Sequence, residues 1–210
     1  MSPSLEGTWM RRHAKGWLIG TGTVLAVFGA LVWGLGLFRA DTSSPQAAAP
    51  QYLPGSVQVF RFLASQSSNY CGLRPGVLSS YSNKGRLEGA CCNPMDLATY
   101  RAQVQQLERY RDIWVIPTDP YNVAVPVAKT LLGYDSSIRL TSQQQAVYDQ
   151  AMKMTPDKGP CCCRCWRWDA DAGLAKYLIT SRHFGARQVA SVVWLMNGCG
   201  GRHSAGLSAT

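Results

Sequence analysis

Residues 159–168 read GPCCCRCWRW, a stretch that places four of the eight cysteines of the chain within five positions, at Cys161, Cys162, Cys163 and Cys165. A random scatter over 210 residues does not give this density. Gly159 and Pro160 end any helix that precedes them, and Asp169 is suited to cap the next one. We therefore expect the four thiols at an ordered bend between two helices.

Soft-metal binding is the first interpretation of this cluster. Thiolates select Cu(I), Zn(II) or iron–sulfur clusters, and four thiolates close a tetrahedral zinc site. Because the side chains of adjacent cysteines diverge, so dense a cluster suits a multi-copper core or ligands shared with distant cysteines. We expect copper or zinc, with Cys161, Cys163 and Cys165 as direct ligands. The site would be completed by Cys162, Cys91, Cys92 or Cys199.

Structural disulfides are the second interpretation, and they lead to a different function. Four cysteines lie in the cluster and four outside it, at Cys71, Cys91, Cys92 and Cys199. Pairing each cluster thiol with an outside thiol leaves 24 of the 105 connectivities that eight cysteines allow. Four such bridges would staple a small domain. The chain would then be a non-enzymatic interaction module of a membrane complex.

Redox catalysis is a third interpretation. Cys162 and Cys165 have the C-x-x-C spacing of thiol–disulfide exchange proteins. Such motifs usually follow a strand in a βαβ unit, and the sequence has no such pattern. Haem attachment needs a His directly after C-x-x-C, where this chain has Trp166, so we expect no haem.

Residues 160–165 carry a resemblance to a known family. The pattern Pro160-Cys161-x-Cys163-x-Cys165 resembles the signature of bacterial extracytoplasmic proteins named for a Pro-Cys-Tyr-Cys-Gly-Cys motif. Cys replaces the Tyr of that motif at position 162, and Arg replaces its Gly at position 164. The resemblance implies an exported, membrane-tethered or lipid-anchored protein that handles metal.

The N-terminal part contains a predicted membrane anchor. Residues 17–38 form an uncharged apolar stretch, and about 20 such residues span a bilayer as a helix. Three basic residues precede it and only Arg39 follows it directly. The positive-inside rule then places residues 1–16 in the cytoplasm and the later residues outside. A cleaved signal peptide would have a shorter apolar core. We expect a single-pass protein of the cell membrane, with the membrane as a partner.

The remainder is expected to be mainly α: a flexible linker at 39–55, a small Cys-rich helical domain at 56–200 and a loose tail at 201–210. Asn93 and Pro94 predict the start of a helix that carries Leu97, Tyr100, Val104 and Leu107. Residues 123–132 predict a second helix, weakened by Pro126 and closed by Gly133. The short run 113–116 is expected to be extended.

Three more helices are expected around the cysteine cluster, one before it and two after it. Thr141 or Ser142 is suited to cap a helix that runs to about Met154. Asp169 is expected to cap the helix after the cluster, and Gly185 precedes a last helix that ends at Gly198.

The charge pattern and the missing motifs narrow the function. The net charge is +9, yet no run of five basic residues occurs, so we expect no nucleic-acid partner. The sequence has no G-x-S-x-G, H-E-x-x-H or phosphate-binding glycine loop, so we expect no catalytic residues and no enzyme. The function most consistent with the sequence is soft-metal sequestration or delivery outside the cytoplasm, with a membrane protein or metal-delivery partner.

Overall fold

A computed structural model describes residues 53–201. The expected cytoplasmic tail, the apolar stretch at 17–38, most of the linker and residues 202–210 lie outside the described residues. Within 53–201, no helix is long and apolar enough to span a membrane.

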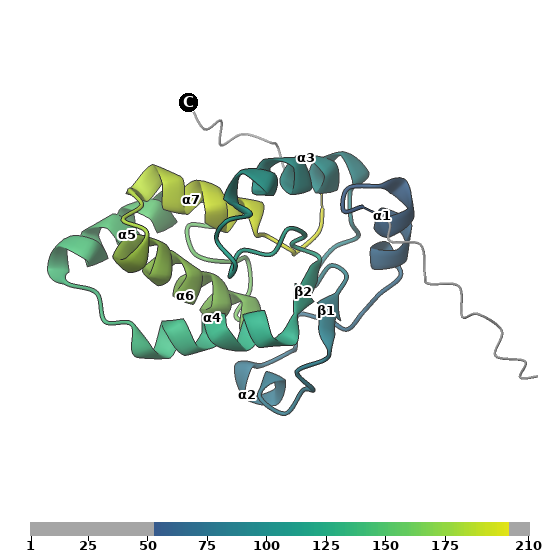
Figure 1. Cartoon of the computed structure of the whole chain (residues 1–210), viewed down its shortest axis with the longest axis horizontal. Coiled ribbons are helices and arrows are strands. Elements are labelled where there is room, and N and C mark those ends of the chain that lie inside the picture. The colour runs from purple at the N-terminus through teal and green to yellow at the C-terminus, as the bar shows by residue number, and fades with distance from the viewer. Residues whose placement is uncertain (1–52, 202–210) are drawn as a thin grey trace, which may run out of the picture. The chain divides into compact units, whose positions relative to one another are not determined.

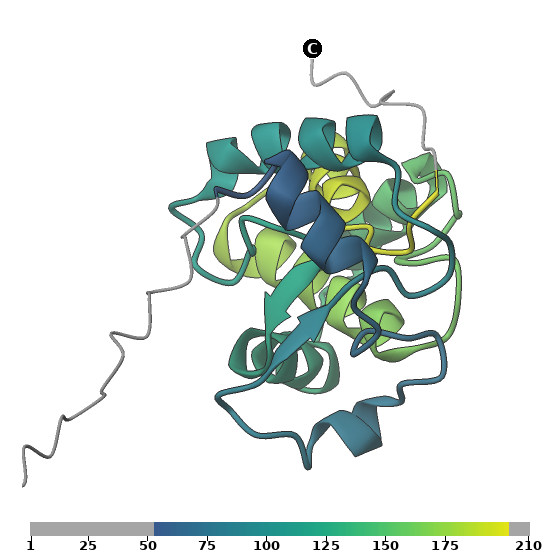
Figure 2. The same ribbon diagram turned by 90° about the vertical axis from the view of Figure 1, so that its right-hand side faces the viewer.

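The described part is mainly α, as the sequence predicted, and 52% of it is helical. The seven helices of this part appear in Figures 1 and 2 and are α1 (Val57–Ala64), α2 (Pro75–Leu78), α3 (Leu97–Leu107), α4 (Val125–Ser137), α5 (Ser142–Met154), α6 (Trp166–Ser181) and α7 (Ala186–Leu195). A short 3-10 turn, η1 (Glu108–Tyr110), follows α3. Strands β1 (Arg86–Glu88) and β2 (Asn122–Ala124) pair antiparallel, with Leu87 opposite Val123.

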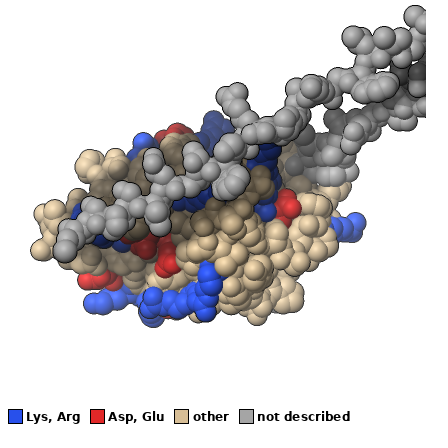
Figure 3. Space-filling model, turned by 90° about the horizontal axis from the view of Figure 1, so that it is seen from below, with Lys and Arg blue, Asp and Glu red and all other residues tan. Residues whose placement is uncertain are grey.

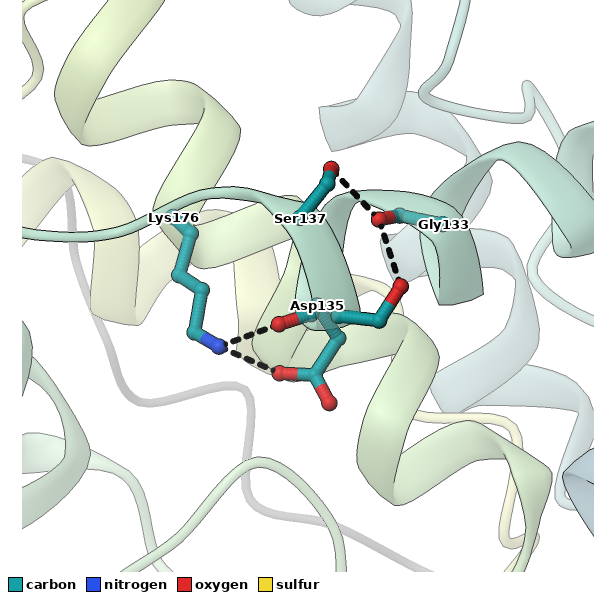
Figure 4. A network of polar contacts seen from close by, with 5 residues as sticks. Gly133, Asp135, Ser137 and Lys176 are labelled. Carbon is teal, nitrogen blue, oxygen red and sulfur yellow. Dashed lines mark hydrogen bonds and ion pairs between the residues drawn. The ribbon is translucent and has the colours of Figure 1, made fainter.

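Helices α4 and α6 make the most extensive contact of any two elements in the described part. Gly173 permits this approach, because a Cβ atom there would lie 2.0 Å from the carbonyl oxygen of Leu131 in α4. The Lys176 Nζ donates to the carbonyl oxygen and to the carboxylate of Asp135, at 2.6 and 2.7 Å (Figure 4). The rings of Tyr134 and Tyr177 stack in parallel, with their centroids 4.9 Å apart. These contacts fix α6, whose first residue follows the cysteine cluster.

The main core lies between α4, α5, α6 and α7, where the buried face of each helix contributes aliphatic side chains. A second, smaller core consists of Leu63, Tyr100 and Tyr121 between α1 and α3. The Tyr100 hydroxyl donates to the buried carboxylate of Asp119 at 2.6 Å and accepts from the Gly55 amide at 3.0 Å. The last residues of the expected linker are therefore attached to the domain.

Two predicted helix starts are confirmed. The Thr141 hydroxyl accepts from the Gln144 amide, and the Gln144 side chain accepts from the Thr141 amide, so a capping box opens α5. The Gly185 amide donates to the side chain of Gln188 at the start of α7. Helix α7 ends at Leu195, three residues before Gly198.

The predicted start of α3 at Asn93 is wrong, because Asp96 is the cap and accepts from the Thr99 amide. The cause is a long-range contact. The amide of Gly201 donates to the carbonyl of Pro94, and Met95 forms a parallel bridge with Gly201. These pairings hold residues 93–95 outside the helix.

Other predicted boundaries are corrected in a similar way. Residues 122–124 form β2, and α4 then continues past Gly133 to Ser137. Pro126 lies in the first turn of α4, where the missing amide costs nothing. The run 113–116 is a series of turns rather than extended. Helix α6 begins at Trp166, three residues before the expected cap Asp169, and its N-cap is Cys165.

Charged side chains of both signs lie on the surface of the described part. On the face shown in Figure 3, Lys and Arg side chains lie in separate patches with Asp and Glu side chains nearby.

Replacing Gly173 by Ala tests the packing of α4 on α6. The added methyl group meets backbone atoms 2.0 and 2.7 Å away, so we expect Gly173→Ala to lower the free energy of unfolding by about 3 kcal/mol. Gly133→Ala, in the same helix pair but with no atom within 4 Å, should leave the stability unchanged or raise it by up to about 1 kcal/mol. Urea unfolding of the full reduced chain measures both, and equal stabilities would contradict the close approach.

Candidate metal centre

The sulfur atoms of all eight cysteines form one connected network. None is joined in a disulfide, since all eight are free thiols. The Sγ–Sγ distances are 3.0 Å for Cys71–Cys163 and Cys162–Cys199, 3.2 Å for Cys71–Cys92 and Cys161–Cys199, 3.4 Å for Cys91–Cys92, 3.5 Å for Cys91–Cys199 and Cys163–Cys165, and 3.7 Å for Cys92–Cys162 and Cys92–Cys163. The structure thus brings together every predicted ligand.

The predicted bend between two helices is present at residues 155–165 and is built by local hydrogen bonds. The Thr155 hydroxyl donates to the carbonyl of Gly159 and accepts from its amide. Lys158 has a φ of 53°, a left-handed conformation that turns the chain sharply. Cys165 is the N-cap residue of α6, so the cysteine cluster ends where the longest helix of the described part begins.

Backbone pairing brings two further cysteines of the network, Cys91 and Cys92, beside Cys199. The amide of Cys91 donates to the carbonyl of Gly198, and the amides of Cys92 and Asn93 donate to the carbonyl of Cys199. Gly200 makes this approach possible, because its φ is +76° and a Cβ atom would lie 1.9 Å from the Asn93 carbonyl oxygen. The prediction that Cys91 and Cys92 directly precede a helix is wrong, since α3 begins later.

Cys71 belongs to the network, although the sequence did not place it among the metal ligands. Its segment is attached to the bend by two hydrogen bonds: the Trp166 amide donates to the Leu73 carbonyl at 2.9 Å, and the Arg74 guanidinium donates to the Arg164 carbonyl at 2.8 Å. No local pattern around Cys71 indicates this contact. Only the even number of cysteines suggested that it has a partner.

The eight thiols differ strongly in exposure. Cys91, Cys161, Cys165 and Cys199 are buried, with exposed fractions of 8, 2, 1 and 1%. Cys163 is half-buried, and the exposed thiols are Cys71, Cys92 and Cys162. The network therefore has an enclosed side and a solvent side.

Two tryptophans, Trp166 and Trp168, cover the enclosed side. Trp168 packs against the buried thiols, and the guanidinium of Arg164 lies 3.8 Å from the centre of its ring. Trp166 is 1% exposed and lies with Cys165 in the main core. Its indole N–H donates to the buried side chain of Asn69 at 3.0 Å. Water is therefore excluded from about half of the network.

The thiols share protons because they lie so close together. Hydrogen bonds from Cys161 and Cys91, together with the backbone amide of Arg167 at the start of α6, lower the pKa of Cys165 well below its ordinary value. The same hydrogen bonds to Cys165 raise the pKa of Cys161 and that of Cys91, and burial adds to both. These hydrogen bonds and the position of Cys165 at a helix N-terminus both favour the thiolate form at Cys165 over that at its neighbours.

A buried arginine and a buried aspartate lie on α6 next to the network. The Arg167 guanidinium donates to the carbonyls of Met196 and Pro120. Its positive charge opposes, without cancelling, the rise in the pKa of Cys91. Asp171 is buried, and its Oδ2 has no hydrogen-bond partner among the described residues. Burial raises the pKa of Asp171 well above its ordinary value, and the negative charge of Cys165 also raises it.

The sulfurs form four sets of three in which all Sγ atoms lie within 4.8 Å of one another. These three-sulfur groups are Cys71–Cys92–Cys163, Cys91–Cys163–Cys165, Cys91–Cys92–Cys199 and Cys161–Cys162–Cys199. Four cysteines belong to two groups each, so the groups are linked through shared sulfurs. No other His, Cys, Asp or Glu within residues 53–201 extends any of them to four ligands.

The methionines near the cysteines in sequence serve packing. Met152 and Met196 are buried in the main core, and Met154 packs against it. Met95 packs against the smaller core formed by Leu63, Tyr100 and Tyr121. The soft ligands of the site are therefore thiols.

The C-x-x-C spacing does not form a redox pair of the thioredoxin kind. Cys162 and Cys165 belong to different three-sulfur groups, and the strands β1 and β2 pair antiparallel rather than in a βαβ unit.

Compared with protein-family models, with curated proteins and with solved structures, the chain has no match. The interpretation of the site therefore depends on its own geometry.

The difference in exposure predicts an order of thiol modification in the reduced chain. A maleimide should modify Cys71, Cys92 and Cys162 before Cys161, Cys165 and Cys199, because burial blocks access even where a thiolate is favoured. Burial and the hydrogen bond to Cys71 raise the pKa of Cys92 from 9.0 to about 11, so its modification should still accelerate above pH 9.0. Peptide mass spectrometry after short exposure gives the order. Simultaneous modification of all eight thiols before unfolding would contradict the enclosed side.

Proposed function

We propose that this chain binds soft metal ions, copper or zinc, in its cysteine network for sequestration or delivery. The observation that supports this most is that eight sulfurs from four separate segments lie within one continuous network of contacts. Stapling needs sulfurs in separate pairs, whereas ion binding needs sulfurs that share neighbours. Most of these thiols contact more than one other thiol.

The geometry favours Cu(I) over Zn(II). Zinc sites are tetrahedral with Zn–S bonds of about 2.3 Å, which places four sulfurs about 3.8 Å apart. The sets found in residues 53–201 contain three sulfurs, the number that a trigonal Cu(I) ion takes. Shared sulfurs such as Cys91 and Cys163 would bridge two ions. The proposal is therefore a polynuclear copper–thiolate core with up to one ion in each three-sulfur group.

The cellular setting is part of the same proposal. The apolar stretch at 17–38 would anchor the chain, and the basic residues before it would keep the N-terminus in the cytoplasm. The cysteine domain would then lie outside the membrane, tethered by the linker. A tethered binder of this kind keeps toxic free copper away from the bilayer or passes it to a membrane partner.

A disulfide-stapled module is the second candidate, and one pairing favours it. Cys71–Cys163, Cys92–Cys162 and Cys161–Cys199 contact at 3.0, 3.7 and 3.2 Å. The remaining pair, Cys91 and Cys165, belongs to one three-sulfur group, so its sulfurs lie within 4.8 Å of each other. Each pair joins a cluster thiol to an outside thiol, as the sequence arithmetic required. Oxidation would need only small side-chain movements to reach the S–S bond length of about 2.05 Å.

Metal content and free thiols, measured together, separate the two candidates. We expect the reduced full chain to bind several Cu(I) ions in competition with a chromophoric chelator, with its thiols inaccessible to a thiol reagent while copper is bound. Replacing Cys163 and Cys165 by Ser should lower the number of bound ions, because Cys163 serves two three-sulfur groups. A chain purified without reductant that has no free thiols and no metal would instead establish the stapled module.

Met95→Leu is the matched control for this measurement. It removes a soft sulfur from a residue that lines the same surface region as Cys91 and Cys92 but packs in the smaller core. Because Met and Leu exchange with little cost in a core, the fold should survive. The number of bound ions should stay that of the unmodified chain, and a loss equal to that of the cysteine variant would contradict a thiol-only core.

A further inference from the structure

We infer that ions enter and leave the network through one of its three-sulfur groups, Cys71–Cys92–Cys163, by ligand exchange with the thiolate of a carrier. This group is called the exchange group below. The inference rests on the proposed metal binding and adds the route and the chemistry of the partner. It follows from the unequal exposure of otherwise similar groups.

The exchange group is the most accessible of the four. Cys71 and Cys92 are exposed, and Cys163 is half-buried. Each of the other groups contains two buried thiols. The most enclosed is Cys91–Cys163–Cys165, in which Cys165 is only 1% exposed and lies in the main core beside Trp166. An ion held there would be less open to an incoming ligand than one in the exchange group, because this group contains no exposed thiol.

Accessibility decides the rate because a soft ion changes thiolate ligands by association. The incoming sulfur forms a bond to the ion before the outgoing sulfur leaves. At the exchange group, the carrier thiolate would bond to Cu(I) while the bond to Cys71 Sγ breaks, and Cys71 would then take up a proton. No electron is transferred, so the step needs neither oxidant nor reductant.

Shared sulfurs connect the exchange group to the interior. Cys163 belongs both to the exchange group and to the most enclosed group, and Cys92 belongs both to the exchange group and to Cys91–Cys92–Cys199. An ion can therefore move inward by exchanging the other ligands while it keeps one sulfur. Cys71 occurs in the exchange group alone, so it is the ligand whose release opens the route.

The surroundings of the exchange group favour an anionic carrier. The segment of Cys71 is held to the bend by the guanidinium of Arg74, which donates to the carbonyl of Arg164. Arg74 is exposed and forms no ion pair with a carboxylate within the described residues. Its guanidinium lies at the backbone carbonyl between Cys163 and Cys165, where its positive charge would attract a thiolate that carries further negative charge, as a small acidic thiol does.

Two serine variants of the copper-loaded full chain test the route. Copper per chain is measured first, and the loaded chain is then mixed with an excess of an anionic Cu(I) chelator while the copper–chelator absorbance is followed. We expect a fast phase equal to one ion and a slow phase for the others. Cys71→Ser should remove the fast phase and keep the slow one.

Cys165→Ser is the matched variant, since Cys165 also occurs in a single group, the most enclosed one. Serine is a favourable N-cap, so α6 should still form. This variant should keep the fast phase and lose part of the slow one. A single rate for all ions, or a fast phase that survives in Cys71→Ser, would overturn the route while leaving metal binding intact. A wild-type chain that takes up no copper in the first measurement would overturn the proposed function and the route together.

Discussion

Eight sulfurs in contact cannot all carry a negative charge unless cations lie among them. Two unit charges 4 Å apart in a protein surface environment repel by about 4 kcal/mol, and the sulfurs here are separated by as little as 3.0 Å. In the reduced chain the charge is limited by raising the pKa of thiols such as Cys161 and by sharing their protons with Cys165. Metal ions, like oxidation, remove the same repulsion, and metal binding releases the shared protons.

The rest of the fold supplies a rigid support for this crowded network. Helix α6 is fixed along its length by α4, through Gly173 and Lys176, and its N-terminus carries Cys165. The other cysteines lie in segments without regular structure, which are attached to that support by hydrogen bonds from backbone and buried side chains. Gln103 in α3, for example, donates to the carbonyls of Leu195 and Asn197 just before Cys199. A precise site thus depends on one rigid helix and several attached loops.

Sequence patterns predicted the parts of this arrangement that depend on neighbours in the chain. The bend at 155–165 and the capping box at Thr141 follow from residues within a few positions of one another. The start of α3 was misplaced because a long-range bridge from Gly201 holds Met95. Cys71 was not placed among the ligands for the same reason, since its neighbour Leu73 is fixed by an amide 93 residues further along the chain, that of Trp166. Contacts of this kind leave no local periodicity or motif.

The division of the network into an enclosed and an open side bears on whether it would store or deliver ions. A uniformly buried core would hold ions well but release them only when the domain opens, because an incoming ligand must reach the ion. A uniformly exposed one would exchange quickly and protect nothing. Here the tryptophans shield the buried thiols, while Cys71 reaches the network from a surface segment that two hydrogen bonds hold in place. Retention and exchange would therefore be assigned to different sulfurs of one network, which suits a protein that holds an ion until a carrier arrives.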